Sequence, residues 1–460
     1  MLKENEESHF NQYTCLSHCW GEFQPLETTT QSIAANKIRI SWNELPKTFQ
    51  HAITFTRLIG INHIWIDSLC IIQNDMDDWA AESAKMSSIY ANAFLTIAAT
   101  ASQDATEGCF RTTHPEDKRK PKEFTLNHRE NDSMSTFATA EIHVGPQPLL
   151  KRGWVLQERL LSQRVIYFNE YELAWQCRTK VICECGGFEP IYSPLDTLFL
   201  DDPWMMIVEP YSHLRLGKEK DKLPALSGLA STFQNRPSFL QDQLSHNKPL
   251  GEYYAGLWQR NFVDHLCWYV RDASHKRLDK YRAPTWSWAS VEDGILFWAA
   301  LGSPVFTAHM LSAECFRSTA DPYGQVSGGY VDLRTILIPA ELHFGHTSKD
   351  HIIVGGATKT GKISKEIIFK GGLDLDVVDS KFDAANTIGI ACAILGIWFY
   401  RTDKDVGDLH SVLALVLEPS QPDLKSLKRI GLVRRFEMKQ DDYAPFRDMV
   451  NGHQKTIRIS

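Results

Sequence analysis

The 460-residue chain lacks the features that mark membrane and nucleic-acid-binding proteins. Its longest apolar run, TIGIACAILGIWFY at residues 387–400, is shorter than the roughly 20 residues of a spanning helix, so we interpret it as a buried strand or core helix. The chain has no block of basic residues, and its formal net charge is −7. We therefore expect no membrane span and no nucleic-acid partner.

Cysteine is also scarce, with ten residues spread over the chain. That density is too low for a disulfide scaffold, and the first residues, MLKENEESHF, do not resemble a signal peptide, so we expect a cytoplasmic protein. Two segments, CLSHC and CRTKVICEC, contain residue types that bind zinc, but neither has the paired C-x2-C spacing of a zinc site. We therefore favour free thiols and expect no metal and no cofactor. The thiols and imidazole concerned are those of Cys15, His18, Cys19, Cys177, Cys183 and Cys185.

The first 100 residues alternate between strand and helix patterns. A helix is predicted at residues 45–60, where Pro46 suits a first turn and Gly60 a stop. A second helix is predicted at residues 75–93, with Asp75 or Asp77 as its cap. This order predicts an α/β layer with a mostly parallel sheet. The predicted strands are YTCLSHCWG, INHIWIDSLCII and FLTIAAT, and we interpret the second as a strand covered on both faces.

The rest of the chain divides into regions of different character. After a polar stretch, RGWVLQERLLS predicts a helix, and QRVIYFNEYELAWQC predicts two strands joined by a turn at residues 169–170. We predict an α/β domain at residues 1–180, a helical or mixed region at 181–300 and a β-rich region at 301–460. The last region contains VDLRTILIPAELHFG, KEIIFKGGLDLDVVD and HSVLALVLEP, which resemble strands.

Polar residues at the ends of two predicted strands make the first candidate site. Asp67 ends HIWID, at the edge where a doubly wound sheet binds ligands, although an aspartate there also suits the cap of a turn. Ser17 and Trp20 end the first strand, and Gly21 permits a close backbone approach. Together they predict an aromatic-walled cleft. Cys19 and Cys70 are weaker candidates as nucleophiles, because an apolar setting such as that of Cys70 raises the pKa of a thiol.

Glu158, in RGWVLQERLLS, is the second candidate. On a helical wheel it lies about 40° from Trp154, so it shares a largely apolar face. A buried carboxylate is unfavourable unless it is paired or hydrogen-bonded. Two interpretations remain open: Glu158 pairs with a neighbouring arginine, or it faces the cleft and acts on a ligand. The neighbouring arginines are Arg152, Arg159 and Arg164.

These segments resemble the HET (heterokaryon incompatibility) domain family of filamentous fungi. The resemblance covers roughly residues 13–291 and rests on YTCLSHCWG, the stretch from LPKTFQHAITF to LTIAAT, RGWVLQERLLS and YRAPTWSWASV. DKLPALSGLA and YYAGLW resemble the region that follows the domain in long members. The family implies allorecognition, in which HET domains trigger cell death after incompatible hyphae fuse.

HET domains are also remotely similar to TIR domains, which implies a TIR- or flavodoxin-like fold. TIR-type enzymes that cleave NAD carry a glutamate in a segment of the form W-C-x-x-E-L, and WVLQERL places Glu158 there. The resemblance thus implies that Glu158 is catalytic and stabilises an oxocarbenium-like charge, with NAD as substrate. Trp20 or Trp154 would stack on a flat base, while Asp67 and Gln157 would line the same cleft.

Three functions remain open at this point. The first is a cell-death effector that cleaves NAD. The second is a biosynthetic enzyme on the same scaffold, such as a cofactor-free cyclase or pericyclase (a Diels-Alderase, for example) of secondary metabolism, which the 13 tryptophans favour. The third is a non-catalytic adaptor. A small-molecule ligand and a homo-oligomer are the partners that these functions leave open.

Overall fold

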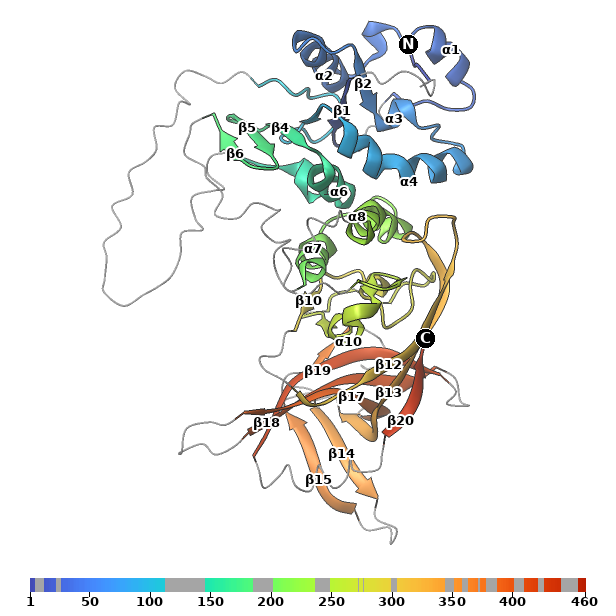
Figure 1. The fold of residues 1–460 in the computed structure, drawn as a ribbon, viewed down its shortest axis with the longest axis vertical. Coiled ribbons are helices and arrows are strands. Elements are labelled where there is room, and N and C mark those ends of the chain that lie inside the picture. The colour runs from blue at the N-terminus through green and yellow to red at the C-terminus, as the bar shows by residue number, and fades with distance from the viewer. Residues whose placement is uncertain are drawn as a thin grey trace, which may run out of the picture. The chain divides into compact units, whose positions relative to one another are not determined.

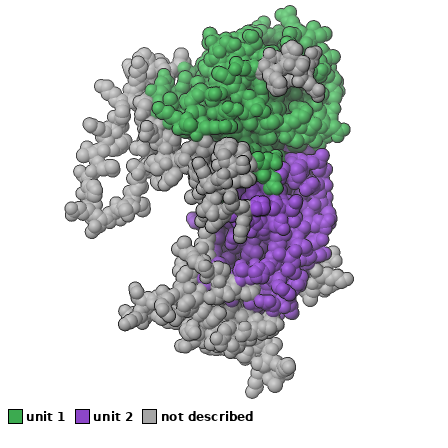
Figure 2. All heavy atoms as spheres, viewed as in Figure 1, with its two compact units in different colours: residues 1–203, 214–217, 224–245 green, residues 204–213, 218–223, 246–460 purple. Residues whose placement is uncertain are grey.

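The computed structural model describes most of the chain in two compact units, which are treated separately below (Figure 2). Unit 1 comprises residues 1–203, 214–217 and 224–245, and unit 2 comprises residues 204–213, 218–223 and 246–460. The predicted three-part division stays a prediction. No helix in the described part is long and apolar enough to cross a membrane. The described residues are 1–4, 12–21, 26–111, 145–184, 202–235, 249–271, 273–275, 277–298, 304–343, 351–357, 363–370, 373–377, 387–400, 409–420, 426–439 and 454–460.

Unit 1 is built on a six-stranded sheet in the order β2-β1-β3-β4-β5-β6 (Figure 1). The first four strands in this order are parallel, and β5 and β6 continue the sheet antiparallel. The N-terminal part is therefore a mixed sheet with helices, in agreement with the coarse α/β prediction. Its strands are β1 (Tyr13–Ser17), β2 (His63–Ile66), β3 (Leu95–Ala98), β4 (Arg164–Phe168), β5 (Leu173–Cys177) and β6 (Val181–Cys183).

Helices cover both faces of this sheet. Alternate residues of β1 point to opposite sides, so they show which helix packs on which face. Leu16 packs in a cluster with Phe49 of α2, whereas Cys15 packs with Met86 and Tyr90 of α4. Helices α6 and α8 lie with α4, since each of these three contacts the other two. The helices of unit 1 are α1 (Ile33–Ile38), α2 (Lys47–Leu58), α3 (Asp67–Cys70), α4 (Met76–Asn92), α6 (Gly153–Leu161) and α8 (Pro224–Gln234), with 3-10 turns η1 (Trp42–Glu44) and η3 (Pro148–Lys151).

Local predictions for unit 1 agree with the structure except in one segment. Helix α2 follows Pro46, and the Asp75 side chain caps α4 by accepting hydrogen bonds from the backbone N–H groups of Asp77 and Asp78. The interpretation of INHIWIDSLCII as one strand is wrong, because β2 ends at Ile66 and α3 begins at Asp67. At this point the Asp67 carboxylate accepts a 2.8 Å hydrogen bond from the backbone N–H of Ser68, within the first turn of α3. β2 is also half-buried and stands first in the strand order.

Unit 2 is dominated by a ten-stranded sheet, which agrees with the predicted β-rich C-terminal region. The apolar run at residues 387–400 is strand β17, near the middle of the sheet's aliphatic cluster. Its main path runs β11-β17-β18-β19-β20-β13-β14-β15, with β12 paired to β13 and β16 to β19. The strands are β11 (Pro304–Thr307), β12 (His309–Arg317), β13 (Val326–His343), β14 (His351–Ala357), β15 (Ile363–Lys370), β16 (Leu373–Leu375), β17 (Thr387–Tyr400), β18 (Leu409–Pro419), β19 (Leu427–Lys439) and β20 (Gln454–Ile459).

Shorter elements and a tryptophan-rich core complete unit 2. Hydrogen bonds from the indoles of Trp204 and Trp288 to the carbonyl of Gly256, at 2.8 and 3.1 Å, fix the turn of YYAGLW. Ala255 in this turn has a φ of 42°, a conformation that these bonds hold in place. The elements are α7 (Pro203–Ser212), α10 (Phe262–His265), η5 (Glu219–Asp221), η6 (Gln259–Asn261), η7 (Trp288–Ser290), β7 (Tyr253–Tyr254), β8 (Leu257–Trp258), β9 (Trp268–Tyr269) and β10 (Leu296–Phe297).

An ion pair lies fully buried in unit 2. The Arg429 guanidinium and the Asp376 carboxylate have no solvent exposure, and Nε of the arginine lies 2.9 Å from Oδ2 of the aspartate. Arg429 also donates to the carbonyls of Leu266 and Trp268, and its guanidinium lies 3.4 Å from the centroid of the Trp268 ring. The two charges therefore neutralise each other and the guanidinium has further acceptors, as buried charges require.

Candidate functional site

The candidate site lies where the parallel strands of unit 1 end. β1 pairs with β2 on one side and β3 on the other, so the strand order changes direction at β1. In doubly wound sheets the connections diverge at such a point and leave a crevice outside the carboxyl ends of the strands. Ser17 is the last residue of β1, and Asp67 directly follows β2. The topology thus brings the two predicted strand ends to one edge.

Glu158 reaches this edge from α6 and is bonded to Ser17. The Ser17 hydroxyl donates to Oε2 of Glu158 at 2.5 Å, and the two residues are only 2% and 6% exposed. Burial raises the pKa of Glu158 to about 7, although the bond from Ser17 opposes that shift and the Asp67 charge adds to it. A carboxyl group with this pKa exchanges its proton near neutrality, which is a property of functional carboxylates.

None of the three arginines close to Glu158 in sequence forms an ion pair with it in the described part of the chain. Arg152 donates to the backbone carbonyl of His18, and its charge lowers the pKa of Glu158 without outweighing burial. Arg164 donates to the carbonyl of Phe94 at 3.2 Å. The carboxylate is instead held by a hydroxyl, and hydrogen bonding from Tyr90 also lowers its pKa. Glu158 is therefore buried with hydrogen-bond partners, and among the residues that the structure describes it has no full counter-charge.

A second hydrogen-bonded group forms the more exposed side of the edge. The Trp20 indole donates to Oδ2 of Asp67 at 2.9 Å, and the Asp67 side chain is 20% exposed. Nδ1 of His18 lies 3.7 Å from Oδ1 of Asp67. Burial lowers the pKa of His18 to about 4, so its ring is neutral at pH 7. Neither ring nitrogen has a hydrogen-bond partner in the described part of the chain.

The other predicted ligand-binding residues have protein neighbours. Gln157 is fully buried, and its Oε1 accepts a 2.8 Å hydrogen bond from the backbone N–H of Gly228 in α8. Trp154 is half-buried and meets Trp79 edge to face, with ring centroids 6.3 Å apart. Gly21 has a φ of 72° and packs so closely on Asp104 that an added Cβ would lie 2.3 Å from the Cβ of that residue. A ligand-binding role for all six residues stays a prediction.

The cysteine alternatives are weakened by burial. Burial raises the pKa of the Cys70 thiol to about 11, and it also raises the pKa of Cys19, so neither supplies a ready thiolate. No group of three or more histidine, cysteine or carboxylate side chains suited to a metal occurs within the described ranges. Cys185, in the second candidate zinc segment, lies outside them.

Two contributors to the site were missed from the sequence. Tyr90 lies in the helix predicted at residues 75–93, but the sequence does not single it out; its hydroxyl also donates to the carbonyl of Leu16 at 3.3 Å. Gly228 lies in ALSGL, where a glycine inside an apolar helical pattern is a signal for close packing. Neither signal specifies the partner, which lies far away in the sequence.

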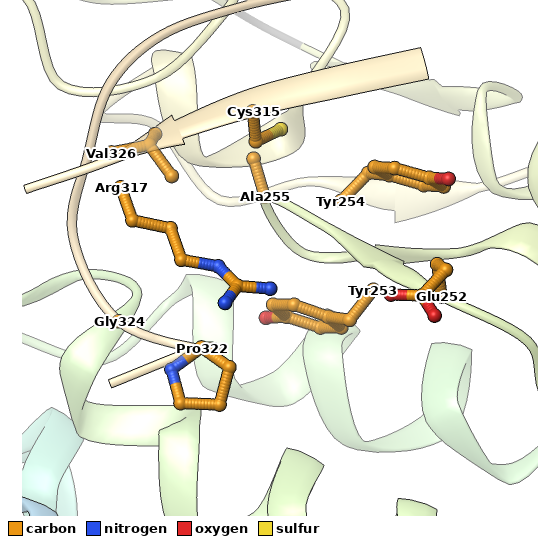
Figure 3. A pocket seen from close by; sticks show the side chains of 9 residues that line it. All are labelled: Glu252, Tyr253, Tyr254, Ala255, Cys315, Arg317, Pro322, Gly324 and Val326. Carbon is orange, nitrogen blue, oxygen red and sulfur yellow. The ribbon is translucent and has the colours of Figure 1, made fainter. Parts of the chain in front are cut away.

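A small cavity in unit 2 is a poorer candidate. Its volume is about 50 Å³, room for a few water molecules, compared with roughly 300 Å³ or more for an ordinary ligand pocket. Tyr253 of the YYAGLW hairpin lies beside Arg317 there, and Tyr254 lines another part of the cavity (Figure 3). The lining residues are Glu252, Tyr253, Tyr254, Ala255, Cys315, Arg317, Pro322, Gly324 and Val326.

Comparison with known proteins gives a family match. Residues 13–158 match the family described as heterokaryon incompatibility protein (HET), and the match ends at Glu158. No curated protein and no solved structure matches the chain. The matched residues include β1 to β3 and most of α6, and thus both groups of hydrogen-bonded side chains described above.

Proposed function

Because residues 13–158 match the heterokaryon incompatibility (HET) family, we propose that the chain is an effector of heterokaryon incompatibility that cleaves NAD. The observation that supports the enzymatic part is the buried carboxyl of Glu158, bonded to Ser17 at the carboxyl edge of a parallel sheet. A carboxylate with no full counter-charge is suited to stabilising a cation that forms beside it.

The proposed reaction breaks the bond between nicotinamide and ribose. Nicotinamide leaves with the bonding electrons, the ribose carbon becomes oxocarbenium-like, and water attacks that carbon. The products are nicotinamide, ADP-ribose and one proton. Ionised Glu158 stabilises the developing positive charge, Ser17 holds the carboxylate in place, and Trp20 and Asp67 contact the substrate from the exposed side of the edge.

We further propose that the domain is TIR-like within the flavodoxin-like group of folds. The parallel strands have the order β2-β1-β3-β4, which is the beginning of the flavodoxin-like order 2-1-3-4-5. In such sheets the ligand lies at the point between the first and third strands, where Ser17 ends β1 and Ala98 is its partner in β3.

The test is release of nicotinamide from NAD by the full chain, measured across a range of protein concentrations because assembly is a common requirement for effectors. We expect Glu158→Gln to reduce the rate at least 100-fold. Glu44→Gln is a matched control, since Glu44 is an exposed glutamate of unit 1. No release by the unaltered chain at any concentration, or equal rates for the Glu158 variant, would overturn the proposal.

The same variants separate an enzyme from an adaptor in cells. Expression in a filamentous fungus should cause growth arrest with the unaltered chain and with Glu44→Gln, but not with Glu158→Gln. Growth arrest that survives Glu158→Gln would favour the adaptor. Conversion of a hydrophobic metabolite precursor, with NAD left intact, would favour the biosynthetic enzyme.

A further inference from the structure

Helix α8 is part of the fold around Glu158 although it follows the HET-matched residues in sequence. The family match ends at residue 158, whereas α8 spans Pro224–Gln234. Eight of its eleven residues are buried, and it packs against both α4 and α6 in unit 1 (Figure 1). The helix that carries Glu158 is therefore covered by a segment from the next region of the chain.

The contact between α8 and α6 is close and specific. The N–H of Gly228 donates to Oε1 of Gln157 at 2.8 Å, and this donor fixes which end of the amide faces α8. An added Cβ at Gly228 would lie 2.2 Å from Cβ of Ser87 in α4 and 2.7 Å from Oε1 of Gln157. Only glycine therefore fits between α4 and α6 at this point.

Gln157 directly precedes Glu158 on α6, so a constraint on one side chain limits the other. The Glu158 carboxylate accepts a hydrogen bond from Ser17. The backbone carbonyl of Glu158 accepts a 2.7 Å hydrogen bond from the Ser162 hydroxyl. That hydroxyl lies 2.6 Å from the hydroxyl of Thr96 in β3. These bonds fasten α6 to the sheet. The bond from Gly228 fixes the rotation of α6 from another direction, about 100° around the helix.

Packing alone does not account for a glutamine at position 157. Its side chain is fully buried, yet Nε2 has no hydrogen-bond partner among the residues that the structure describes. A buried amide with one unpartnered end is less favourable than an apolar residue of similar size. A glutamine at position 157 is therefore explained by its Oε1 atom, which accepts the hydrogen bond from the backbone N–H of Gly228.

We propose that Gln157 is a positioning residue for Glu158, and that the Gly228 contact makes the candidate site depend on α8. This inference deepens the proposed function and rests on it for its catalytic meaning.

The experiment uses the full chain and two variants that act on the contact from opposite sides. Gly228→Ala pushes α8 away from Gln157, and Gln157→Leu removes the acceptor while it keeps most of the volume. Gly217→Ala is the matched control, because no atom lies within 4 Å of a Cβ added at Gly217. The first readout is the pKa of the Glu158 carboxyl. It is measured by a pH titration that is monitored by infrared difference spectroscopy, with Glu158→Gln as the reference.

We expect both variants to lower the pKa of Glu158 towards its ordinary value, because a loosened α6 admits water and burial is the largest cause of the raised pKa. The Gly217→Ala chain should titrate like the unaltered one. We also expect Gly228→Ala combined with Ser87→Gly to recover part of the change, since that pair removes the closest overlap. An unchanged titration in folded Gln157→Leu would overturn the proposal.

The second readout is the kinetics of nicotinamide release. A positioning role predicts a fall in kcat of about tenfold or more with KM little changed, together with a shifted pH profile. A general loss of stability would lower the yield of folded protein without moving either the profile or the titration. The titration requires no turnover, so this proposal can fail while the NAD proposal stands, and the reverse also holds.

Discussion

The two units bury charged side chains in opposite ways. Unit 2 encloses Arg429 and Asp376 as a pair with no exposure, and the guanidinium has two carbonyl acceptors besides its carboxylate. Unit 1 encloses Glu158 with the Ser17 hydroxyl as a hydrogen-bond donor, and burial raises the pKa of the carboxyl to about 7. In unit 2 the charges of Arg429 and Asp376 neutralise each other. In unit 1 the pKa of Glu158 is close to neutral pH, so its carboxyl exchanges between the protonated and the ionised form.

This difference distinguishes a structural charge from a functional one. A fully paired ion cluster stabilises a fold only while both partners are present, and its loss is severe. A lone buried carboxylate weakens the fold when it ionises, so its presence calls for a different explanation, such as chemistry at the site. Variants that remove each charge should therefore have effects of opposite sign on stability.

The largest effect is expected for Asp376→Asn. This change leaves the Arg429 guanidinium buried without its carboxylate and should lower the free energy of unfolding of unit 2 by about 3–5 kcal/mol. Urea unfolding followed by tryptophan fluorescence measures it. Asp332→Asn is the control, because its pair with Arg458 is partly exposed and should be worth about 0–1 kcal/mol. Equal losses for the two variants would remove the contrast between the units.

Glu158→Gln should have the opposite sign above neutral pH. The folded pKa of Glu158 is about 7 and its ordinary value is 4.5, so the folded state binds the extra proton and stability falls as pH rises through that window. Ionised Glu158 should lower the stability of unit 1 by roughly 3 kcal/mol above pH 7. The variant lacks this loss, so its gain over the unaltered chain should grow between pH 4.5 and 7. A pH-independent difference would contradict the assignment.

Ser17→Ala should change the free energy of unfolding by an amount between those expected for Glu158→Gln and Trp20→Phe. It removes the hydroxyl that bonds the carboxylate, and hydrogen bonds to charged groups contribute about 1.5–3 kcal/mol. Because that bond lowers the pKa of Glu158, its loss should raise the pKa further and move the pH profile of nicotinamide release upward. Ser88→Ala, at an exposed serine of α4, should change neither quantity. A profile that stays in place would argue against Ser17 as the partner in solution.

Trp20→Phe should have the smallest effect. The ring is kept, but the indole N–H that bonds Asp67 is lost, which should lower stability by about 1 kcal/mol. We expect KM for NAD to rise several-fold, since Trp20 and Asp67 lie on the exposed side of the edge. Thermal unfolding and steady-state kinetics measure the two effects. A stability loss as large as that of Ser17→Ala would show that Trp20 is mainly structural.

Local patterns predicted the elements of unit 1 well because they depend on neighbouring residues. The cap at Asp75 and the start of α2 after Pro46 follow from side chains within a few positions. The strand ends at Ser17 and Asp67 were placed at one edge by the parallel topology alone. The short helix α3 was missed because an apolar run such as SLCII suits a buried strand and a helical turn equally well.

Long-range contacts could not be predicted in the same way. Nothing near Glu158 in sequence indicates Ser17, which lies 141 positions away, and the arginines close in sequence were the more obvious partners. The role of Gly228 depends on a contact across 71 positions. Hydrophobic periodicity states which face of a helix is buried, but it does not state which element covers that face.

The interleaved order of the units has a consequence for inheritance. The chain passes between the units repeatedly between residues 203 and 246, so the pieces of unit 1 are separated by pieces of unit 2. A single recombination breakpoint anywhere in the gene would thus divide at least one unit or join α8 to a foreign sheet. We expect the two units to be exchanged between alleles as one block, with compensating changes where α8 meets α6.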